Sequence, residues 1–332
     1  MIGDAVPMLL NGADPLAIAL AATRLAAGDL VALPTETVYG LGARADDDAA
    51  VAKIFAAKGR PADHPLIVHV LDAADAACFS TELPLLAKRL MAAFWPGPLT
   101  VIVPRAPAMA AAAAGGQNSI GLRCPAHPVA RALLVAARAQ GVLGVAAPSA
   151  NRFGRVSPTQ AQHVVSEFEA DLMVLDGGEC AVGIESSIVD CSRGGAVLLR
   201  PGVLTQAQIE AALGQPLQAN DAHAPRASGT LAAHYAPRAT VRLYSAVDLA
   251  VRLTRPLPLG LAVYSRTVAA AHVGLRRHMP AAALAAAQQL FAALRELDAA
   301  GAQEIWIELP PLGNEWDGVR DRLTRAAAAF EA

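Results

Sequence analysis

The sequence is poor in net charge, in lysine and in aromatic side chains. Only 17% of its 332 residues are charged and 4% are aromatic, and the formal net charge is −2. So small a net charge argues against a protein that holds nucleic acid by bulk electrostatics, although it leaves a local basic patch open. The only lysines are Lys53, Lys58 and Lys88. In a chain that otherwise uses arginine, a compact and flexible ammonium at position 58 indicates a specific use.

Cysteine is also scarce, and its spacing excludes the common metal motifs. Cys78, Cys124, Cys180 and Cys191 form no CxxC pair and have no nearby histidine in metal-ligand register, so we expect free thiols in a reducing compartment. No stretch of about 18 uninterrupted apolar residues is available to span a bilayer. Residues 1–10 lack the basic start and the cleavage site of a signal peptide. These absences predict a cytoplasmic protein without a membrane partner.

What the chain has in abundance is apolar surface. A hydrophobic fraction of 54%, much of it alanine, provides for a large core, and the length favours two domains. Short apolar segments alternate with helical patterns over 10–213, which predicts an α/β domain with a mixed sheet. A polar segment at 214–238, rich in Gln, Asn, His, Pro and Ser, predicts a linker. Residues 239–332 predict a second, small α/β domain.

The expected elements follow from the apolar patterns and from the breakers between them. In the first domain we expect helices at 14–27, 46–57, 83–94 and 127–140, and strands at 30–33, 66–70, 99–103, 119–123, 142–147, 172–175, 187–190 and 196–199. In the second we expect strands at 240–244, 260–264 and 304–309, and helices at 246–253, 280–299 and 316–330.

Two polar tripeptides in Gly/Pro-rich turns are the main functional candidates. Lys58 and Arg60 lie in the run Ala-Lys-Gly-Arg-Pro, and Ser149 and Asn151 flank an alanine further along the chain. Two cations one residue apart can hold adjacent phosphate oxygens, while a hydroxyl and a carboxamide supply directional hydrogen bonds to another part of a ligand. Taken alone, each tripeptide is better explained as a solvated loop with ordinary surface charges, but the two do not stand alone.

Pro34–Gly42, which contains Thr35 and Tyr39, is dense in hydrogen-bonding groups at the end of an expected strand. Open α/β sheets bind ligands beyond such strand ends. Gly40–Ala45 formally matches the GxGxxG/A dinucleotide fingerprint, but the glycines do not stand at a strand-to-helix turn, so we do not expect a dinucleotide there. A Walker A sequence is absent. Any triphosphate site must therefore have another design.

Several polar residues stand at the boundaries of other expected strands. Arg123 ends one of them, where it either anchors a ligand carboxylate or pairs with a nearby Asp or Glu. Ser187 and Arg200 flank two more, and His64, taken alone, is more typical of a structural histidine. The pair His234-Tyr235 is unusual for a linker. It either staples the two domains together or covers an active site.

Taken in order, these strings resemble the threonylcarbamoyl-AMP synthase family, the YrdC-like enzymes, in its longer two-domain form. The resemblance runs from about residue 12 to the end of the chain, and it is specific because order and spacing agree together. The matching strings are Pro34–Gly42, Lys58-Gly59-Arg60, His64-Pro65-Leu66, Trp95-Pro96-Gly97, Gly121-Leu122-Arg123, Pro148-Ser149-Ala150-Asn151, Gly183–Ser187, Arg200-Pro201-Gly202 and His234-Tyr235-Ala236-Pro237.

The resemblance implies a fold, a reaction and a site. The fold is a YrdC-like twisted mixed sheet with helices, followed by a small Rossmann-like α/β domain. The reaction joins L-threonine, bicarbonate and ATP, with Mg²⁺ accompanying the nucleotide, into threonylcarbamoyl-AMP and pyrophosphate. The implied catalytic residues are Lys58 and Arg60, the implied ATP-binding residues are Lys58, Arg60, Ser149, Asn151, Arg200 and Tyr235, and the implied threonine-binding residues are Thr35, Tyr39, His64, Arg123 and Ser187.

The resemblance also implies partners. The product would pass to a downstream threonylcarbamoyl transferase that forms threonylcarbamoyladenosine in tRNA, and a weak contact with tRNA is allowed. Two alternatives remain at this point. One is a related carbamoyl-adenylating module of hydrogenase maturation, although that module normally sits in a much longer chain. The other is an RNA-binding or ribosome-assembly factor without turnover, against which the acidic net charge counts.

Overall fold

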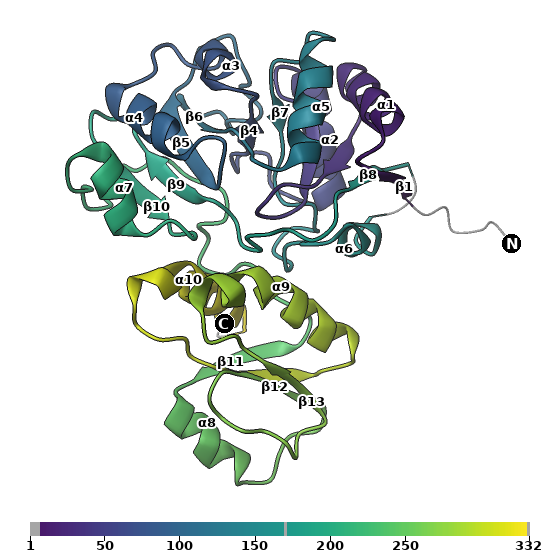
Figure 1. Ribbon diagram of the computed structural model, residues 1–332, viewed down its shortest axis with the longest axis vertical. Helices are drawn as coiled ribbons and strands as arrows, with labels where there is room; N and C mark the ends of the chain where they lie inside the picture. The colour runs from purple at the N-terminus through teal and green to yellow at the C-terminus, as the bar shows by residue number, and fades with distance from the viewer. Residues whose placement is uncertain (1–6, 169–170, 331–332) are drawn as a thin grey trace, which may run out of the picture.

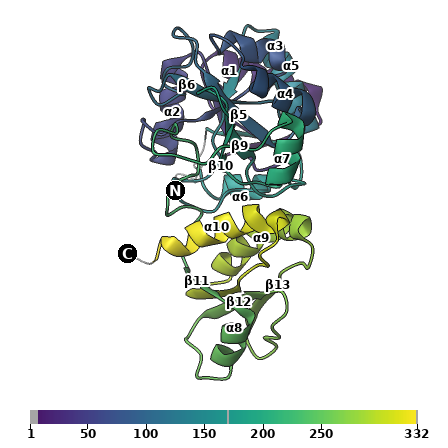
Figure 2. The same cartoon turned by 90° about the vertical axis from the view of Figure 1, so that its left-hand side faces the viewer.

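Two sheets organise the chain, one for each of two domains. The computed structural model describes residues 7–168 and 171–330. Within these residues the first sheet has the strand order β1-β8-β2-β3-β7-β4-β6-β5-β9-β10 and the second has the order β11-β14-β12-β13. Figure 1 shows the second domain stacked beneath the first, and the view turned by 90° in Figure 2 shows the same arrangement.

The first domain is a mixed α/β structure. Its sheet contains both parallel pairings, such as β1 with β8, and antiparallel pairings, such as β2 with β3, and helices cover both faces (Figure 1). Its strands are β1 Met8–Asn11, β2 Val31–Leu33, β3 Gly40–Arg44, β4 Ile67–His69, β5 Leu99–Pro104, β6 Ser119–Arg123, β7 Val145–Ala146, β8 Met173–Asp176, β9 Ser187–Asp190 and β10 Val197–Arg200. Its helices are α1 Pro15–Ala26, α2 Asp48–Lys58, α3 Ala73–Cys78, α4 Leu85–Phe94, α5 Pro128–Arg138, α6 Ala161–Val165 and α7 Gln206–Leu213.

The second domain has a wholly parallel sheet. Strands β11 Thr240–Tyr244, β14 Glu304–Glu308, β12 Leu261–Ser265 and β13 Leu275–His278 pair in that order. Helix α8 Ala246–Leu253 lies on the far face, whereas α9 Ala283–Ala299 and α10 Asp317–Ala328 lie on the face turned toward the first domain (Figure 1). A short 3₁₀ turn, Asn314–Trp316, precedes α10. The expected Rossmann-like second domain is therefore confirmed.

Local sequence explains how the Lys58–Arg60 turn is presented. Asp47 caps α2, because its side chain accepts hydrogen bonds from two backbone N–H groups of the first turn. Gly59 ends the helix with φ at 63°, a left-handed conformation that glycine adopts at little cost. Lys58 is therefore the last residue of α2, and Arg60 begins the turn that follows.

Gly40–Arg44 differs from expectation because it is a strand. It pairs antiparallel with β2, and Val31 lies opposite Gly42. A dinucleotide fingerprint requires its glycines to turn from a strand into a helix, so this pairing agrees with the rejection of that motif. The other elements that sequence patterns did not predict are β1, β13 and the short helices α3, α6 and α7.

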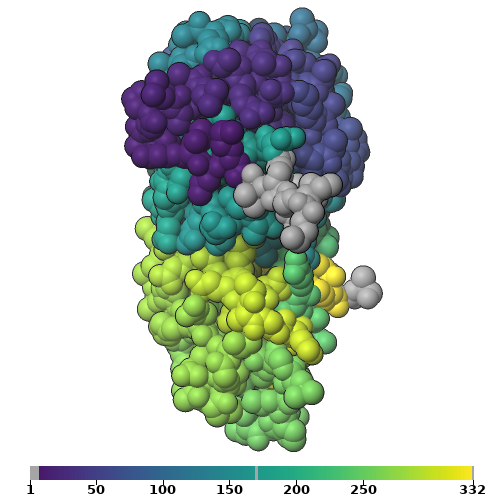
Figure 3. Space-filling view, turned by 90° about the vertical axis from the view of Figure 1, so that its right-hand side faces the viewer, coloured from purple at the N-terminus to yellow at the C-terminus, as the bar shows by residue number. Residues whose placement is uncertain are grey.

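The two domains share a packed boundary. Val38, Val156 and Ile184 of the first domain belong to the same apolar cluster as the inner faces of α9 and α10. Figure 3 shows segments of the two domains in direct contact on one face of the molecule. Residues 214–239 connect the domains without a helix or strand beyond isolated bridges. We call residues 214–238 the linker.

All four cysteines are free thiols, as expected. Cys78 is exposed, whereas the other three are buried. Burial raises the pKa of the Cys124 and Cys180 thiols and raises the pKa of Cys191 to about 12. No helix in the described part of the chain is both long enough and apolar enough to cross a membrane.

Gly183 marks a close approach between the two domains. It has φ at +80°, and a Cβ atom placed there would lie 2.6 Å from the carbonyl oxygen of Ala287 and still closer to the backbone of Gln288 in α9. Gly178 has the same φ of +80°, but a Cβ atom there would meet nothing within 4 Å. Comparing an alanine substitution at Gly183 with one at Gly178 therefore separates the cost of backbone strain from the cost of a steric clash between the domains.

We expect Gly183→Ala to lower the free energy of unfolding more than Gly178→Ala does. Both variants carry the left-handed strain of about 1–2 kcal/mol, and only Gly183→Ala adds an overpacking cost of about 1–3 kcal/mol at α9. Urea denaturation of both variants measures the difference. Equal losses would show that α9 does not press on residue 183.

Candidate active site

One pocket gathers residues from distant parts of the chain. It has a volume of about 480 Å³, including its open mouth. The loop after β2, the turn after α2, strand β4, the segments that follow or end β6, β7 and β10, the loop before β9 and the linker all contribute. The lining residues are Thr35, Thr37, Val38, Gly40, Arg60, Ile67, His69, Arg123, Ala147, Pro148, Ser149, Glu185, Ser186, Arg200, Ser228 and His234.

Lys58 joins the two tripeptides directly. Its Nζ donates to the carbonyl oxygen of Ser149 at 2.6 Å and to the carbonyl oxygen of Asn151. The side chain is almost fully buried. Burial, followed by the neighbouring Arg60 charge, lowers the pKa of Lys58 well below its usual value. Through these two hydrogen bonds Lys58 fixes the loop that carries Ser149.

Arg60 is a buried cation without a carboxylate partner among the described residues. Its Nη2 donates to the carbonyl oxygen of Pro65 at 3.0 Å, and its guanidinium lies 5.6 Å from the centre of the Phe153 ring. Its Nε is buried and has no hydrogen-bond partner within residues 7–168 and 171–330. Burial lowers the pKa of Arg60 to about 10, so the group stays charged at neutral pH. A cation held in this way is available to an anion.

Asn151 shapes the loop and does not line the pocket. Its Nδ2 donates to the carbonyl oxygens of Arg152 at 2.7 Å and Arg155 at 3.0 Å. Its Oδ1 is buried and has no partner in the described structure. Ser149 lines the pocket itself and pairs with Gly40 through an isolated antiparallel bridge. The loop thus presents Ser149 to the pocket while Asn151 holds its shape.

Arg123 both lines the pocket and pairs with a carboxylate of the chain. Its Nη2 donates to Glu36 Oε1 at 2.6 Å, Nη1 to Thr37 Oγ1 at 2.7 Å, and Nε to the carbonyl oxygen of Gly97 at 3.3 Å. Burial acts to raise the pKa of Glu36, but the Arg123 charge and hydrogen bonds lower it overall. Of the two expected partners for Arg123, the intramolecular carboxylate is the one present in the structure.

Arg200 ties the pocket wall to the linker. Its Nη2 donates to the carbonyl oxygen of Ser186 at 2.8 Å, and its Nη1 donates to the carbonyl oxygen of Ser228 at 2.7 Å. His234 of the linker also lines the pocket, whereas its neighbour Tyr235 does not. Tyr235 has φ at 62° and packs 5.5 Å from the Phe291 ring in the second domain. Two linker residues, Ser228 and His234, thus line the pocket, and Tyr235 contacts the second domain.

The other residues expected at the threonine site are placed as follows. Thr35 lines the pocket and donates to the carbonyl oxygen of Val38 at 2.7 Å. Tyr39 does not line the pocket, and its hydroxyl donates to the carbonyl oxygen of Gly178 at 2.8 Å. His64 also lies outside the pocket lining, with its ring 5.4 Å from that of Phe153.

Ser187 faces away from the pocket, and its neighbour Ser186 faces toward it. The Ser187 hydroxyl is 3.5 Å from the carbonyl oxygen of Leu204, whereas Ser186 lines the pocket and shares a hydrogen bond of 2.8 Å with Thr100. Successive side chains of a strand point to opposite faces. That alternation is the sequence signal that would have distinguished the two serines had the register of β9 been known.

Two further pocket residues were not predicted from the sequence. His69 in β4 is buried, and its Nδ1 has no partner in the described structure. Burial, followed by the Arg123 charge, lowers the pKa of His69 to about 3, so its ring is neutral at physiological pH. Glu185 precedes β9 and is also buried. His69 lies outside the strings that carry the resemblance, whereas Glu185 lies within Gly183–Ser187 but was assigned no role from the sequence.

No group of three or more His, Cys, Asp or Glu side chains in the described part of the chain is arranged to hold a metal ion. The pocket instead concentrates cationic and hydroxyl groups. Arg60, Arg123 and Arg200 supply the positive charge, and Ser149 and Thr35 supply the hydroxyls. Such a set suits phosphate and carboxylate groups.

Two family models match the chain. A model described as "Telomere recombination" matches residues 23–202, and a model described as "Threonylcarbamoyl-AMP synthase, C-terminal domain" matches residues 204–328. The threonylcarbamoyl-AMP synthase of Pyrococcus abyssi is 41% identical over 230 residues, which is 68% of this chain and 66% of that protein. The Bacillus subtilis threonylcarbamoyl-AMP synthase is 43% identical over 241 residues, 70% of this chain and 68% of that protein. These alignments thus span about two thirds of each relative.

A solved structure resembles the whole chain. The Pyrococcus abyssi Sua5 protein in complex with L-threonine superposes with a TM-score of 0.86 at 32% identity and covers 98% of both chains. A likeness that extends over both domains confirms the expected fold.

We expect Glu36→Gln to lower the free energy of unfolding at pH 7 by about 3–5 kcal/mol, because Arg123 is left buried without its counter-charge. The pKa of Glu36 is lower in the folded protein than its ordinary value of 4.5. Its stabilising contribution is therefore complete above that value and is lost as the pH falls through the folded-state pKa. The difference in unfolding free energy between wild type and Glu36→Gln should therefore become smaller at acidic pH. Urea denaturation at pH 7 and at acidic pH measures it.

The control is Glu179→Gln, which changes an exposed carboxylate and should shift stability by less than about 0.5 kcal/mol at either pH. If the loss of unfolding free energy in Glu36→Gln stays the same at both pH values, the stability of the Glu36–Arg123 pair does not depend on protonation of Glu36.

Proposed function

The chain belongs to the threonylcarbamoyl-AMP synthase family, and from this premise we propose that it converts L-threonine, bicarbonate and ATP into threonylcarbamoyl-AMP and pyrophosphate. One observation carries the proposal most directly: Arg60, Arg123 and Ser149, from three distant segments, line one pocket. Two guanidinium groups and a hydroxyl suit a substrate pair that carries phosphates and a carboxylate. The threonine complex of the similar Pyrococcus abyssi protein supports threonine as the amino acid.

The reaction needs two bond-forming steps. The threonine amine attacks bicarbonate and releases water, giving a carbamate. A carbamate oxygen then attacks the α-phosphorus of ATP, the bond to the β-phosphate oxygen breaks, and pyrophosphate leaves. This is a nucleotidyl transfer, which depends on alignment and charge stabilisation more than on a covalent protein nucleophile.

Lys58 and Arg60 supply the charge stabilisation. Negative charge moves toward the pyrophosphate as the bond to the α-phosphorus breaks, and preorganised cations in a buried site act strongly on it. Arg60 already faces the pocket. Lys58 donates to two loop carbonyls, so its ammonium lies at the base of the loop that presents Ser149. Mg²⁺ enters as the MgATP substrate, coordinated by phosphate oxygens rather than by a protein cage.

Arg123 anchors the threonine carboxylate. A guanidinium has five N–H donors, and Glu36, Thr37 and Gly97 each accept from one of them. Two donors therefore remain for a ligand carboxylate, while Glu36 fixes the orientation of the group. Of the other expected threonine contacts, Thr35 also lines the pocket, and Tyr39, His64 and Ser187 stay predictions.

The linker acts as the cover of this site. Ser228 and His234 line the pocket, and Arg200 binds the linker backbone. A cover of this kind excludes water from a reactive mixed anhydride. Threonylcarbamoyl-AMP then leaves for a separate threonylcarbamoyl transferase that modifies tRNA, and the cytoplasm is the compartment in which these substrates meet.

Incubating the protein with MgATP, bicarbonate and one amino acid at a time tests the function. We expect an AMP-linked product of the mass of threonylcarbamoyl-AMP, and a much smaller yield with valine. A site that hydrogen-bonds the threonine hydroxyl leaves those polar groups unpaired when valine binds, which a purely apolar pocket would not do. Mass spectrometry of the products gives the answer. Equal yields with threonine and valine would rule out such a contact, and no adduct with either would refute the synthase.

We expect Lys58→Ala and Arg60→Ala each to reduce turnover by about 100-fold or more, the loss typical of one preorganised charge-stabilising donor. Pyrophosphate release that depends on threonine measures the rate. Lys53→Ala is the matched control, because Lys53 also lies in α2 and donates to a backbone carbonyl, that of Gly28 at 2.7 Å, but at the surface. Near-normal rates in both pocket variants would contradict their assigned roles.

A further inference from the structure

The pocket wall carries a carboxylate that a polyanionic substrate would repel. Among the described residues that line the pocket, Glu185 is the one Asp or Glu, and the residue is 7% exposed. Burial acts to raise the pKa of Glu185, but the charges of Arg322 and Arg200 lower it overall. The carboxylate is therefore ionised at neutral pH. Its charge must be balanced if ATP is to bind beside it.

The positive charge that pairs with Glu185 comes from the second domain. Arg322 in α10 is 1% exposed, and its Nε donates to Glu185 Oε2 at 2.8 Å. Its Nη2 donates to the carbonyl oxygen of the same residue at 3.1 Å, and its Nη1 donates to the carbonyl oxygen of Pro201 at 2.8 Å. The guanidinium also lies 5.3 Å from the centre of the Tyr235 ring. One side chain of α10 thus holds the loop before β9, the segment after β10 and the linker.

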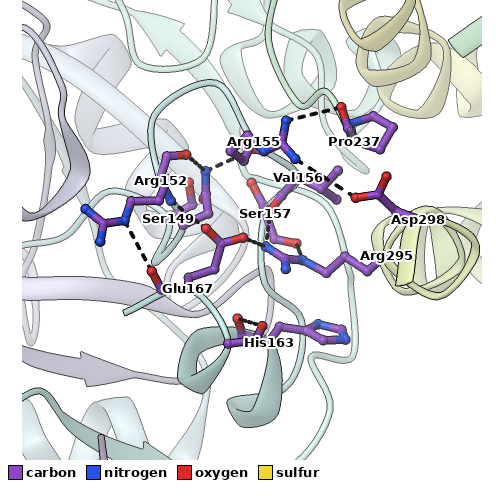
Figure 4. Close-up of polar contacts among 12 residues, drawn as sticks. Ser149, Arg152, Arg155, Val156, Ser157, His163, Glu167, Pro237, Arg295 and Asp298 are labelled. Carbon is purple, nitrogen blue, oxygen red and sulfur yellow. Dashed lines mark hydrogen bonds and ion pairs between the residues drawn. The ribbon is translucent and has the colours of Figure 1, made fainter. Parts of the chain in front are cut away.

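Glu185 also forms a hydrogen bond with the loop of the first domain that presents Ser149. The Ser157 hydroxyl donates to Glu185 Oε1. A second arginine of the other domain, Arg295 in α9, lies close to the carbonyl oxygen of Ser157 at 3.4 Å and pairs with Glu167 at 2.8 Å (Figure 4). Neither Ser157 nor Glu167 lines the pocket. Arg295 therefore docks the domains at a site beside the pocket.

We propose that Arg322 is a positioning residue of the active site, which neutralises and orients Glu185 so that the pocket accepts the triphosphate. The second domain is then an obligatory part of the nucleotide site rather than an independent module. The inference rests on the proposed function, because it needs a polyanionic substrate in this pocket. It assigns Arg322 no contact with substrate.

Removing the guanidinium affects ATP and threonine differently. Without Arg322 the ionised Glu185 faces the phosphates without its hydrogen-bonded counter-charge, and only the more weakly acting Arg200 charge remains near it. Breaking a buried ion pair is costly because one charge stays behind. Threonine is a zwitterion with no net charge, so one added negative charge acts on it much less. A general loosening of the domain boundary would instead weaken the binding of both substrates, because the linker residues Ser228 and His234 belong to the wall of the pocket that both substrates share.

The experiment compares KM for ATP, KM for threonine and kcat in Arg322→Gln with those of the full-length wild type. We expect KM for ATP to rise about tenfold or more, the order of effect of one unscreened charge on a polyanion at an effective dielectric constant near 20. KM for threonine and kcat should change by less than about threefold. Calorimetric titration with MgATP in the absence of threonine gives the nucleotide affinity without turnover.

Three variants keep the test decisive even if Arg322→Gln folds poorly. Arg322→Lys retains the charge and should lie closer to wild type. The double variant Glu185→Gln/Arg322→Gln removes both charges and should restore most of the ATP affinity. Arg295→Gln breaks a partly buried ion pair of the same domain boundary and should leave the ratio of the two KM values unchanged.

The outcomes distinguish a failure of the proposed function from a failure of the role proposed for Arg322. A wild-type protein that makes no threonylcarbamoyl-AMP refutes the proposed function. A wild-type protein that makes it, together with an unchanged KM for ATP in Arg322→Gln, overturns the role of Arg322. That role is also overturned if Arg295→Gln raises KM for ATP as strongly, or if the double variant is no better than Arg322→Gln, because either result indicates loss of docking rather than loss of charge balance.

Discussion

The structure depends on keeping several buried cations together without cancelling their charge. Lys58, Arg60 and Arg200 have no carboxylate partner in the described chain, and backbone carbonyl oxygens hold all three. A carbonyl dipole satisfies the donors of a buried cation but leaves its net charge in place. The turns that contain Ser149, Pro65 and Ser228 are therefore shaped by their carbonyls as much as by their side chains. Such a cluster is stable and still attracts an anion.

The two carboxylates near this cluster have a different task. Glu36 and Glu185 are each buried and each pair with an arginine, Arg123 and Arg322 respectively. The first pair lies within the first domain, whereas the second crosses the domain boundary. Both carboxylates also accept a further hydrogen bond, from the backbone N–H of Ala126 and from the Ser157 hydroxyl. They orient arginines and loops, and the pocket keeps an excess of positive charge.

Much of the fold and the centre of the site could be predicted from the sequence, and the failures have specific physical reasons. Lys58, Arg60 and Ser149 stand in polar turns of an apolar chain, so local composition marks them. The choice between Ser186 and Ser187 depends on strand register, and the choice between His234 and Tyr235 depends on a left-handed φ at residue 235. Arg322 meets Glu185 across 137 residues of sequence. No local pattern marks a contact of that range.

The distribution of the thiols has a practical consequence. Cys124, Cys180 and Cys191 are buried with raised pKa values, so they hold little of the reactive thiolate form. Cys78 alone is exposed, on α3, which Figure 1 places on the part of the first domain remote from the second. A maleimide dye added to the native protein should consequently attach at a single position. Fluorescence from that dye would report on nucleotide or protein encounters without touching the pocket, and no cysteine would have to be engineered in or out.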